Sequence, residues 1–297
     1  MPQAQVIDGK VVAEKLRATL GSVVEELKKE HNLVPGLAVV MVGDDPASRI
    51  YTKNKVKQTL AIGMHSVHRS FPANIPEERL AQEVCSLNED QSIHGILVQL
   101  PLPSHIDTGR ILGLISPEKD VDGFHPINVG RLSSGLNGLV PCTPQGCLLL
   151  LKQVNPDLAG LHAVIVGRSN IVGKPLAQLL LAENCSITVV HSKTPDPQKL
   201  CLQADILISA TGRPEMIKGS WIKRGSIVID VGINRLTASD GTKHIVGDVA
   251  FEDAARVAGA ITPVPGGVGP MTIACLLQNC VKTACEQQGL PWPINFV

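Results

Sequence analysis

Runs of apolar residues alternate with helix-forming segments along the first third of the chain. Apolar runs predict strands at residues 37–42, which should be buried, and 94–100, and we expect a further strand between them at 65–71. Apolar positions recur at helical spacing after Asp8 and from residue 75 onward, and Asp45 followed by Pro46 is a typical helix start. Strands that alternate with helices indicate a parallel sheet with right-handed crossovers. We therefore expect an N-terminal three-layer α/β domain over residues 1–142.

The alternation resumes after residue 142. A predicted helix at 143–153 leads into a second series of apolar runs, which predict strands at residues 161–166, 186–190, 206–209, 226–231, 245–248 and 261–264. An apolar helix at 176–182 follows the first of these strands. This order predicts a Rossmann-like α/β domain over residues 143–270, separated from the first domain by a cleft.

Two further segments bear on how the domains are connected. Residues 128–142 are rich in Gly and Ser, and we expect an irregular hinge there. The last helix, predicted at 271–286, is amphipathic. We expect it to pack back on the first domain, which the segment 271–297 would then complete.

Charge and composition narrow the class of protein. Among 297 residues, Lys and Arg together number 27, as do Asp and Glu, so no net field favours nucleic acid or an anionic membrane. We find neither a basic tract with interleaved aromatic residues nor an apolar run near the length of a membrane span. We therefore expect a protein that binds no nucleic acid and no membrane.

Cysteine usage and the first residues indicate the compartment. The eight cysteines include no Cys-x-x-Cys pair, and most have apolar neighbours, so we expect small hydrophobic side chains rather than disulfides or metal ligands. The opening segment has neither the basic-then-apolar pattern of a secretory signal nor the composition of an organellar one. These features favour a reducing cytosol.

The first candidate chemistry lies just after the first strand. In the helix that begins at Pro46, Ser48, Tyr51 and Lys55 are spaced so that they share one face. Tyr51 is the only tyrosine of a chain with 2% aromatic residues, which makes it a candidate for contact with a flat ligand. Open α/β sheets bind ligands at the carboxyl ends of their strands, where this helix begins.

Lys55 has two candidate partners. Gln99 ends the third strand, and Asp122 follows in a polar loop at 119–125. An amine in a partly apolar cleft beside an amide loses its charge more easily than an exposed lysine, so it can transfer protons near neutrality. Asp122 could accept paired hydrogen bonds from a heterocycle. Taken alone, Lys55 is better explained as an ordinary solvated lysine, and Asp122 is equally well explained as a turn-stabilising aspartate. Only their joint placement at strand ends favours catalysis.

The segment Gly167-x5-Gly173 lies between a predicted strand and a predicted helix, as a dinucleotide-binding turn does. Its glycines permit a tight turn, free N–H groups at the helix start can meet a pyrophosphate, and Arg168 adds a phosphate donor. An ordinary βα turn remains the alternative. The next strand ends in His191-Ser-Lys-Thr194, without the acid that usually binds the ribose of NAD, and this favours NADP.

Five motifs, in order, resemble one family, the bifunctional methylenetetrahydrofolate dehydrogenase/methenyltetrahydrofolate cyclohydrolases. They are Asp44-Asp-Pro-Ala-Ser-x-x-Tyr-x3-Lys55, Val98-Gln-Leu-Pro-Leu-Pro103, Lys119-Asp-Val-Asp-Gly-Phe-His125, Gly167-Arg-Ser-Asn-Ile-Val-Gly-Lys-Pro175 and Pro265-Gly-Gly-Val-Gly-Pro-Met-Thr272. The resemblance runs from the Ile7-Asp-Gly segment to the final helix. It implies a cytosolic enzyme and, on the family alone, a homodimer.

The resemblance also implies residue roles in a folate site. Tyr51 would stack on the aminobenzoyl ring, and Lys55 would be the acid–base residue of the cyclohydrolase step. Gln99 would orient Lys55 and tune its pKa, Asp122 would hold the pterin, and Ser48 would contact substrate or water.

The same resemblance implies an NADP site and a mechanism. It assigns the nucleotide to Gly167, Arg168, Ser169, Ser192, Ile233 and Thr272. The loop 265–270, with Pro265 and Gly266 at the substrate, would close the cleft. Hydride would pass from the methylene carbon to the nicotinamide, and water would then open the methenyl ring to 10-formyltetrahydrofolate. The alternatives are a dehydrogenase without cyclohydrolase activity, a non-catalytic folate- or nucleotide-binding regulator, and an unrelated NADP-dependent reductase.

Overall fold

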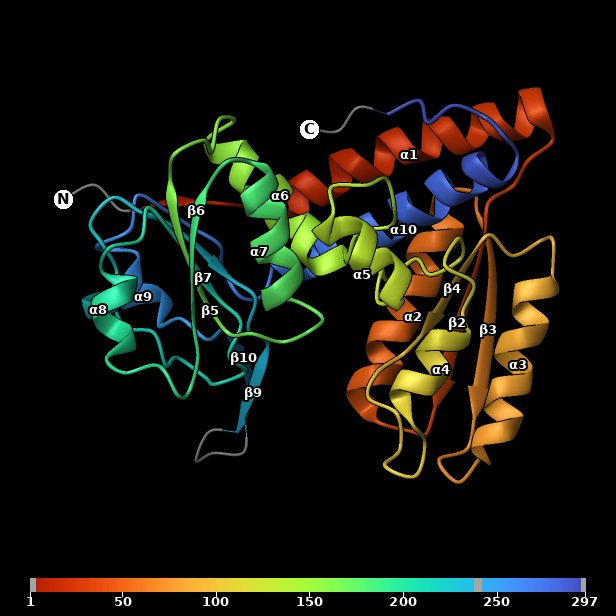
Figure 1. Ribbon diagram of the computed structural model, residues 1–297, viewed down its shortest axis with the longest axis horizontal. Coiled ribbons are helices and arrows are strands. Elements are labelled where there is room, and N and C mark those ends of the chain that lie inside the picture. The colour runs from red at the N-terminus through yellow and green to blue at the C-terminus, as the bar shows by residue number, and fades with distance from the viewer. Residues whose placement is uncertain (1–3, 238–241, 295–297) are drawn as a thin grey trace. The chain divides into compact units, whose positions relative to one another are not determined.

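The computed structural model describes residues 4–237 and 242–294, which form two compact units (Figure 1). Residues 14–142 and 273–294 make up the three-stranded unit. Residues 4–13 and 143–272 make up the six-stranded unit. Within the described residues, no helix is long and apolar enough to cross a membrane.

The three-stranded unit is built on a parallel sheet. Its strands, in the order β3-β2-β4, are β3 (His65–Phe71), β2 (Gly36–Val42) and β4 (Gly95–Val98). This unit contains the helices α2 (Pro46–Ala61), α3 (Glu77–Glu89), α4 (Thr108–Leu114) and α5 (Pro126–Ser133). It also contains all but the first turn or so of α1 (Gly9–His31). All of β2 is buried, as expected for a central strand with both faces covered.

The buried core of the three-stranded unit contains the apolar residues that the sequence pattern predicts to be buried. Ala38 and Val40 of β2 point to one face, where they share a buried cluster with Leu80, Val84 and Leu87 of α3. The three α3 positions recur at helical spacing, so the sequence pattern and the buried face agree.

The six-stranded unit has a parallel sheet of the doubly wound type. Its strands, in the order β1-β11-β8-β7-β5-β6, are β1 (Gln5–Val6), β11 (Ala260–Ile261), β8 (Ile227–Asp230), β7 (Ile206–Ser209), β5 (His162–Val166) and β6 (Ser186–Val190). Around it lie α6 (Cys142–Val154), α7 (Gly173–Ala182), α8 (Pro197–Cys201), the 3-10 helix η1 (Gly219–Trp221), α9 (Phe251–Ala254) and the start of α10 (Val268–Gln287). The chain passes from β5 to β6 on one side and then returns to β7 on the other, so the order reverses at β5. Ligands bind at such a switch point in doubly wound sheets.

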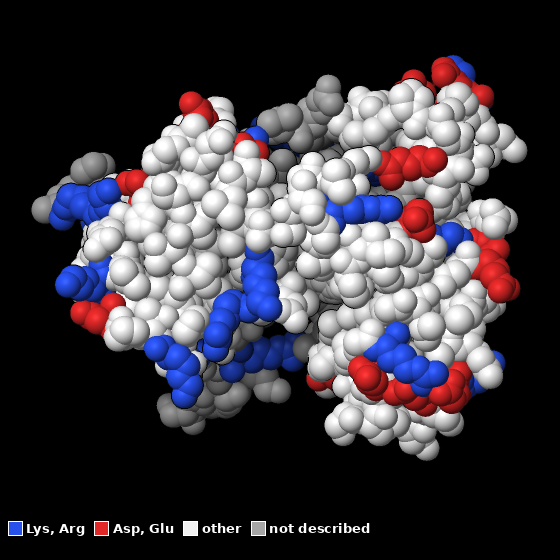
Figure 2. Space-filling model, in the orientation of Figure 1, with Lys and Arg blue, Asp and Glu red and all other residues white. Residues whose placement is uncertain are grey.

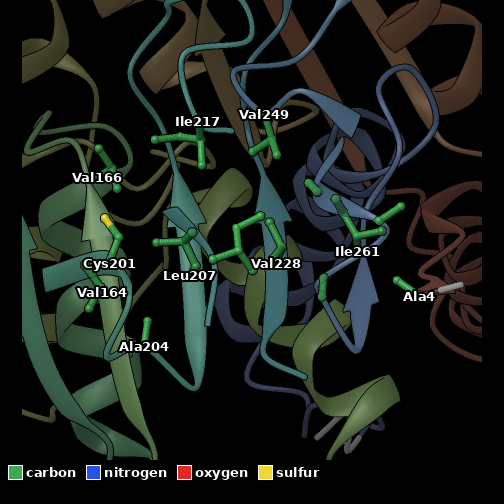
Figure 3. Packing of buried hydrophobic residues seen from close by; sticks show 14 of the residues in the cluster. Ala4, Val164, Val166, Cys201, Ala204, Leu207, Ile217, Val228, Val249 and Ile261 are labelled. Carbon is green, nitrogen blue, oxygen red and sulfur yellow. The ribbon is translucent and has the colours of Figure 1, made fainter. Parts of the chain in front are cut away.

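A row of apolar side chains crosses this sheet (Figure 3). Val164, Leu207, Val228 and Ile261 are successive register partners on β5, β7, β8 and β11, and all are buried in one cluster. The parallel α/β class predicted for the second half of the chain is therefore confirmed.

The structure differs from the expected boundaries at several places. Residues 4–13 belong to the six-stranded unit, because β1 pairs in parallel with β11. Residues 1–3 and 295–297, which were included in the predicted first domain, lie outside the described residues. The expected strand at 245–248 is β10 (Lys243–Val246), which pairs antiparallel with β9 (Asn234–Thr237) outside the main sheet.

The expected irregular hinge is partly wrong, since α5 occupies its first residues. Pro126 takes the first helical position, and Nδ1 of His125 accepts the N–H of Ile127 at 3.1 Å. Helix starts of this kind are favourable because proline has no N–H to lose. The prediction missed this helix because Gly and Ser are typical of irregular segments.

Candidate active site

Helix α2 carries the first group of candidate residues. It begins after Asp45, whose carboxylate accepts the N–H of Ser48 at 2.7 Å, with Pro46 at the first helical position. Nζ of Lys55 lies 5.7 Å from the centroid of the Tyr51 ring, within the range of a cation–π contact. The predicted shared face of this helix therefore places an amine beside the only tyrosine.

Lys55 is buried, with 6% of its surface exposed, so the alternative of an ordinary solvated lysine is wrong. Its Nζ donates to Oε1 of Gln99 at 3.0 Å. Nε2 of Gln99 donates to the Leu100 carbonyl at 2.7 Å, and this second bond orients the Gln99 amide so that its oxygen points at the amine. The backbone N–H of Gln99 donates to the Val40 carbonyl at 2.8 Å, which anchors the residue to the central strand.

Burial and nearby acids set the electrostatics of this group. Burial lowers the pKa of Lys55, and the charge of Asp122 opposes that shift. Burial raises the pKa of Asp122. The Lys55 ammonium and a hydrogen bond from Cys142 both lower that pKa and so oppose the effect of burial. Burial raises the pKa of Cys142 well above its usual value, and the negative charge of Asp122 raises it further, so this thiol stays protonated. We refer to Tyr51, Lys55, Gln99, Asp122 and Cys142 as the acid–base cluster.

The loop that carries Asp122 is held on both sides. Nδ2 of Asn279, on α10, donates to the Val121 carbonyl at 2.8 Å, and Sγ of Cys142 donates to the same carbonyl at 3.2 Å. Asp120 accepts the N–H of His125 at 2.8 Å and Nδ2 of Asn128 at 2.9 Å. The backbone on both sides of Asp122 is thus held by hydrogen bonds, in addition to the bond that its own carboxyl receives from Cys142.

Sequence reasoning did not single out Cys142 or Asn279. Cys142 begins helix α6 but is the last residue of the segment expected to be a hinge, and a cysteine with apolar neighbours gives no indication of a functional role. Asn279 lies in a long buried face of α10, where a lone amide is a hint of a hydrogen-bonded polar group. Its partners, however, are more than a hundred residues away along the chain.

The second group of candidate residues lies at the carboxyl edge of the six-stranded sheet. Gly167 has φ +129°, and a Cβ at this position would overlap the carbonyl oxygen of Ala210. A Cβ at Gly173 would overlap the carbonyl oxygen of Gly167. Residues 167–173, here called the phosphate turn, therefore need glycine at both ends to bring the backbone this close. A tight turn followed by the N-terminus of α7 fits the pyrophosphate of a dinucleotide.

Within the phosphate turn, Oγ of Ser169 accepts the N–H groups of Val172 at 3.2 Å and Gly173 at 3.4 Å, so its hydroxyl stabilises the start of α7. Arg168 and Ser192 are exposed. Each lies the same number of residues beyond its strand end, since Val166 of β5 and Val190 of β6 are register partners. Several Lys and Arg side chains of this unit gather on the side where Figure 1 places the β9–β10 hairpin (Figure 2). A positive surface of this kind suits a phosphorylated ligand.

The remaining candidates are also in the six-stranded unit. Ile233 follows β8 with 52% of its surface exposed. Oγ1 of Thr272 lies 3.0 Å from Oγ1 of Thr143, in hydrogen-bond contact. Pro265 is exposed, and the carbonyl of the buried Gly266 accepts the N–H of Lys10 at 3.1 Å.

A doubly wound sheet with a tight glycine-bounded turn, in a chain that also carries a buried lysine bonded to a half-buried glutamine, indicates a two-domain α/β enzyme that uses a nicotinamide dinucleotide. Residues 7–122 match the family model described as tetrahydrofolate dehydrogenase/cyclohydrolase, catalytic domain, and residues 141–288 match the model of its NAD(P)-binding domain. The chain belongs to the tetrahydrofolate dehydrogenase/cyclohydrolase family.

Individual relatives agree with this assignment. The bifunctional protein FolD of Rhodospirillum centenum is 60% identical over 303 residues, which cover 100% of both chains. The FolD structure from Campylobacter jejuni is 47% identical with a TM-score of 0.92, covering 96% of this chain and 99% of that one. The Trypanosoma brucei enzyme, complexed with NADP cofactor and inhibitor, is 40% identical with a TM-score of 0.92, covering 97% and 99%. The family resemblance inferred from the five motifs is confirmed, and the alternative of an unrelated reductase is excluded.

Proposed function

We propose that this protein oxidises 5,10-methylenetetrahydrofolate to the 5,10-methenyl form with NADP and then hydrolyses that product to 10-formyltetrahydrofolate. The observation that carries the second activity is the buried Lys55 amine bonded to Gln99, because oxidation alone does not require such a pair. The phosphate turn supports the first activity.

In the oxidation step the chain chiefly binds and orients its ligands. Bound NADP supplies a two-electron acceptor. We assign it to the phosphate turn, with Arg168 and Ser192 at the ribose 2′-phosphate and with Ile233 and Thr272 as further contacts. We assign the aminobenzoyl ring of the folate to Tyr51 and the pterin to Asp122, with Ser48, Pro265 and Gly266 as further substrate contacts.

In the hydrolysis step Lys55 transfers protons. Burial lowers the pKa of Lys55 and so favours the neutral amine, which can accept a proton from water as the water oxygen bonds to the methenyl carbon. The bond from this carbon to N5 then breaks as N5 takes a proton from the Lys55 ammonium. Loss of the remaining hydroxyl proton leaves the formyl group on N10. Gln99 accepts a hydrogen bond from Nζ in both charge states and thereby holds the amine in place.

The preference for NADP over NAD has support from the sequence and from one relative. No acid occurs between the end of β6 and Asp196, while Arg168 and Ser192 are exposed at that edge. The Trypanosoma brucei relative is complexed with NADP. We propose that the protein is cytosolic and, on the family resemblance, a homodimer. Sedimentation of the purified protein would check the dimer.

The assay that tests the proposed function uses the purified protein, methylenetetrahydrofolate and either NADP or NAD, and follows the methenyl and formyl products together. We expect formyl product with little accumulation of methenyl, and a faster reaction with NADP. Accumulation of methenyl at the spontaneous hydrolysis rate would indicate a dehydrogenase without cyclohydrolase activity. No turnover with either nucleotide would indicate a folate- or nucleotide-binding regulator.

Replacing Gln99 by glutamate is expected to move the pH dependence of hydrolysis. A carboxylate 3.0 Å from Nζ stabilises the ammonium, so it raises the pKa of Lys55 against the lowering by burial. Because hydrolysis uses the neutral amine, the rising limb of rate against pH should shift upward by about 1 unit or more. The measurement is the methenyl hydrolysis rate at saturating substrate over a pH series, corrected for the spontaneous reaction.

The matched control is Gln91→Glu, which adds the same charge at an exposed position of the same unit. Its pH profile should coincide with that of the unmodified protein. An unshifted profile for Gln99→Glu would show that Lys55 deprotonation does not control this step.

A further inference from the structure

Two buried carboxylates lie among the loops at the carboxyl edge of the six-stranded sheet, outside the residues assigned above. Asp230 ends β8 with 3% of its surface exposed, and Asp248 follows β10 with 0% exposed. Isolated charges are costly to bury, so carboxylates in such places are normally fully hydrogen-bonded. The donors to this pair are backbone N–H groups and one side-chain amide, as the following contacts show.

Asp248 joins two loops. Its Oδ2 accepts the backbone N–H of Thr211 at 2.6 Å and that of Gly212 at 3.1 Å, in the loop after β7. Its Oδ1 accepts Nδ2 of Asn234 at 2.8 Å, in the segment after β8. One side chain thus sets the spacing of two loops that follow neighbouring strands.

Asp230 stabilises this arrangement through three backbone hydrogen bonds. Its Oδ1 accepts the N–H groups of Gly232 at 2.9 Å and Asp248 at 3.0 Å, and its Oδ2 accepts that of Val249 at 2.9 Å. Asp230 therefore fixes the backbone of Asp248 and the turn that precedes Ile233.

The backbone packs closely against both carboxylates. A Cβ at Gly232 would overlap Oδ1 of Asp248, and one at Gly247 would overlap Oδ2 of Asp230. The loop held by Asp248 also contacts the phosphate turn, since a Cβ at Gly167 would overlap the Ala210 carbonyl. Contacts therefore run without a gap from Asp248 through the loop 210–212 to the phosphate turn.

We propose that Asp248, supported by Asp230, is a positioning residue for the dinucleotide: it holds the loops 210–212 and 231–234 in register with the phosphate turn. The inference rests on the proposed assignment of NADP to this edge of the sheet. Convergent N–H donors explain why a carboxylate is needed. An amide at 248 would direct its NH2 group either at the N–H groups of Thr211 and Gly212 or at the amide of Asn234.

The variant that tests this proposal is Asp248→Asn. It keeps the size of the side chain but leaves one hydrogen-bond donor facing another. A buried donor without an acceptor typically weakens an equilibrium that depends on the bond, here NADP binding, by about tenfold. We expect the dissociation constant for NADP, measured by calorimetry, to rise by about that factor, and KM for NADP to rise more than kcat falls. Hydrolysis of methenyltetrahydrofolate without nucleotide should stay at the level of the unmodified protein.

The matched control is Asp205→Asn at the opposite, amino edge of the same sheet. Asp205 accepts the N–H of His162 at 2.9 Å and Nζ of Lys223 at 2.6 Å, so it too is a bonded carboxylate. NADP affinity should not change in this variant. An equal loss of affinity in both variants would mean general destabilisation and would overturn the positioning role.

Other outcomes are equally decisive. Unchanged NADP affinity in folded Asp248→Asn overturns the proposal. If that variant does not fold, Asn234→Ala decides, because it removes only one donor from a half-buried residue: several-fold weaker NADP binding supports the proposal, and unchanged binding overturns it. Failure of the unmodified protein to bind NADP would instead contradict the proposed function.

Discussion

Replacing Lys55 by methionine is expected to abolish enzymatic methenyl hydrolysis while NADP binding stays intact. Methionine keeps an unbranched side chain that fits a buried position, but it has no proton to accept or return. General acid–base catalysis by one side chain typically accelerates a reaction by about 10²–10⁴-fold, and this is the loss we expect in the hydrolysis rate. The phosphate turn lies in the other unit, so calorimetry should give an unchanged dissociation constant for NADP.

The control for this variant is Lys57→Met, on the same helix but exposed. It removes one positive charge without touching Gln99, and hydrolysis should continue at its normal rate. Hydrolysis retained in Lys55→Met, after correction for the spontaneous reaction, would remove Lys55 from its assigned role. A fall in both variants would point to a loss of positive charge rather than of a proton carrier.

Local patterns were enough to predict the face of α2. Asp45 and Pro46 define where the helix begins, and its period then places Tyr51 and Lys55 together whatever the rest of the fold. The phosphate turn was predictable for a similar reason, since a strand, a glycine-bounded loop and a helix are contiguous in sequence. Gln99 could be placed at a strand end, although its bond to Lys55 spans 44 residues and only the folded chain shows it.

What the sequence could not show depends on long-range pairing. Strand β1 is only two residues long, and nothing in it indicates that β11, at the far end of the chain, is its partner. Asp248 looks like an ordinary acid after a strand, because the backbone and side-chain donors that bind it come from other loops. Buried hydrogen-bond networks of this kind have no sequence period, so they appear only in three dimensions.

Replacing Gly173 by alanine is expected to cause the converse loss: NADP binding falls while hydrolysis continues. The added Cβ would overlap the Gly167 carbonyl oxygen and lie 2.9 Å from Cα of Arg168. Both are backbone atoms, which cannot rotate away as a flexible side chain can, so the phosphate turn itself must move. A displacement of about 1 Å in a group that positions a reactant can lower the reaction rate about a hundredfold. We therefore expect NADP-dependent oxidation to slow by about that factor and NADP affinity to fall as well.

Gly130→Ala provides the control, because a Cβ at that helical glycine would meet no atom within 4 Å. Calorimetry with NADP and the nucleotide-free hydrolysis assay should both match the unmodified protein for this variant. If Gly173→Ala binds NADP normally, the close approach of α7 to the turn is not what forms the pyrophosphate site. If it loses hydrolysis as well as binding, then methenyl hydrolysis also depends on the geometry of the phosphate turn. The expected result, together with Lys55→Met, separates NADP binding from methenyl hydrolysis in both directions: each single change removes one and leaves the other.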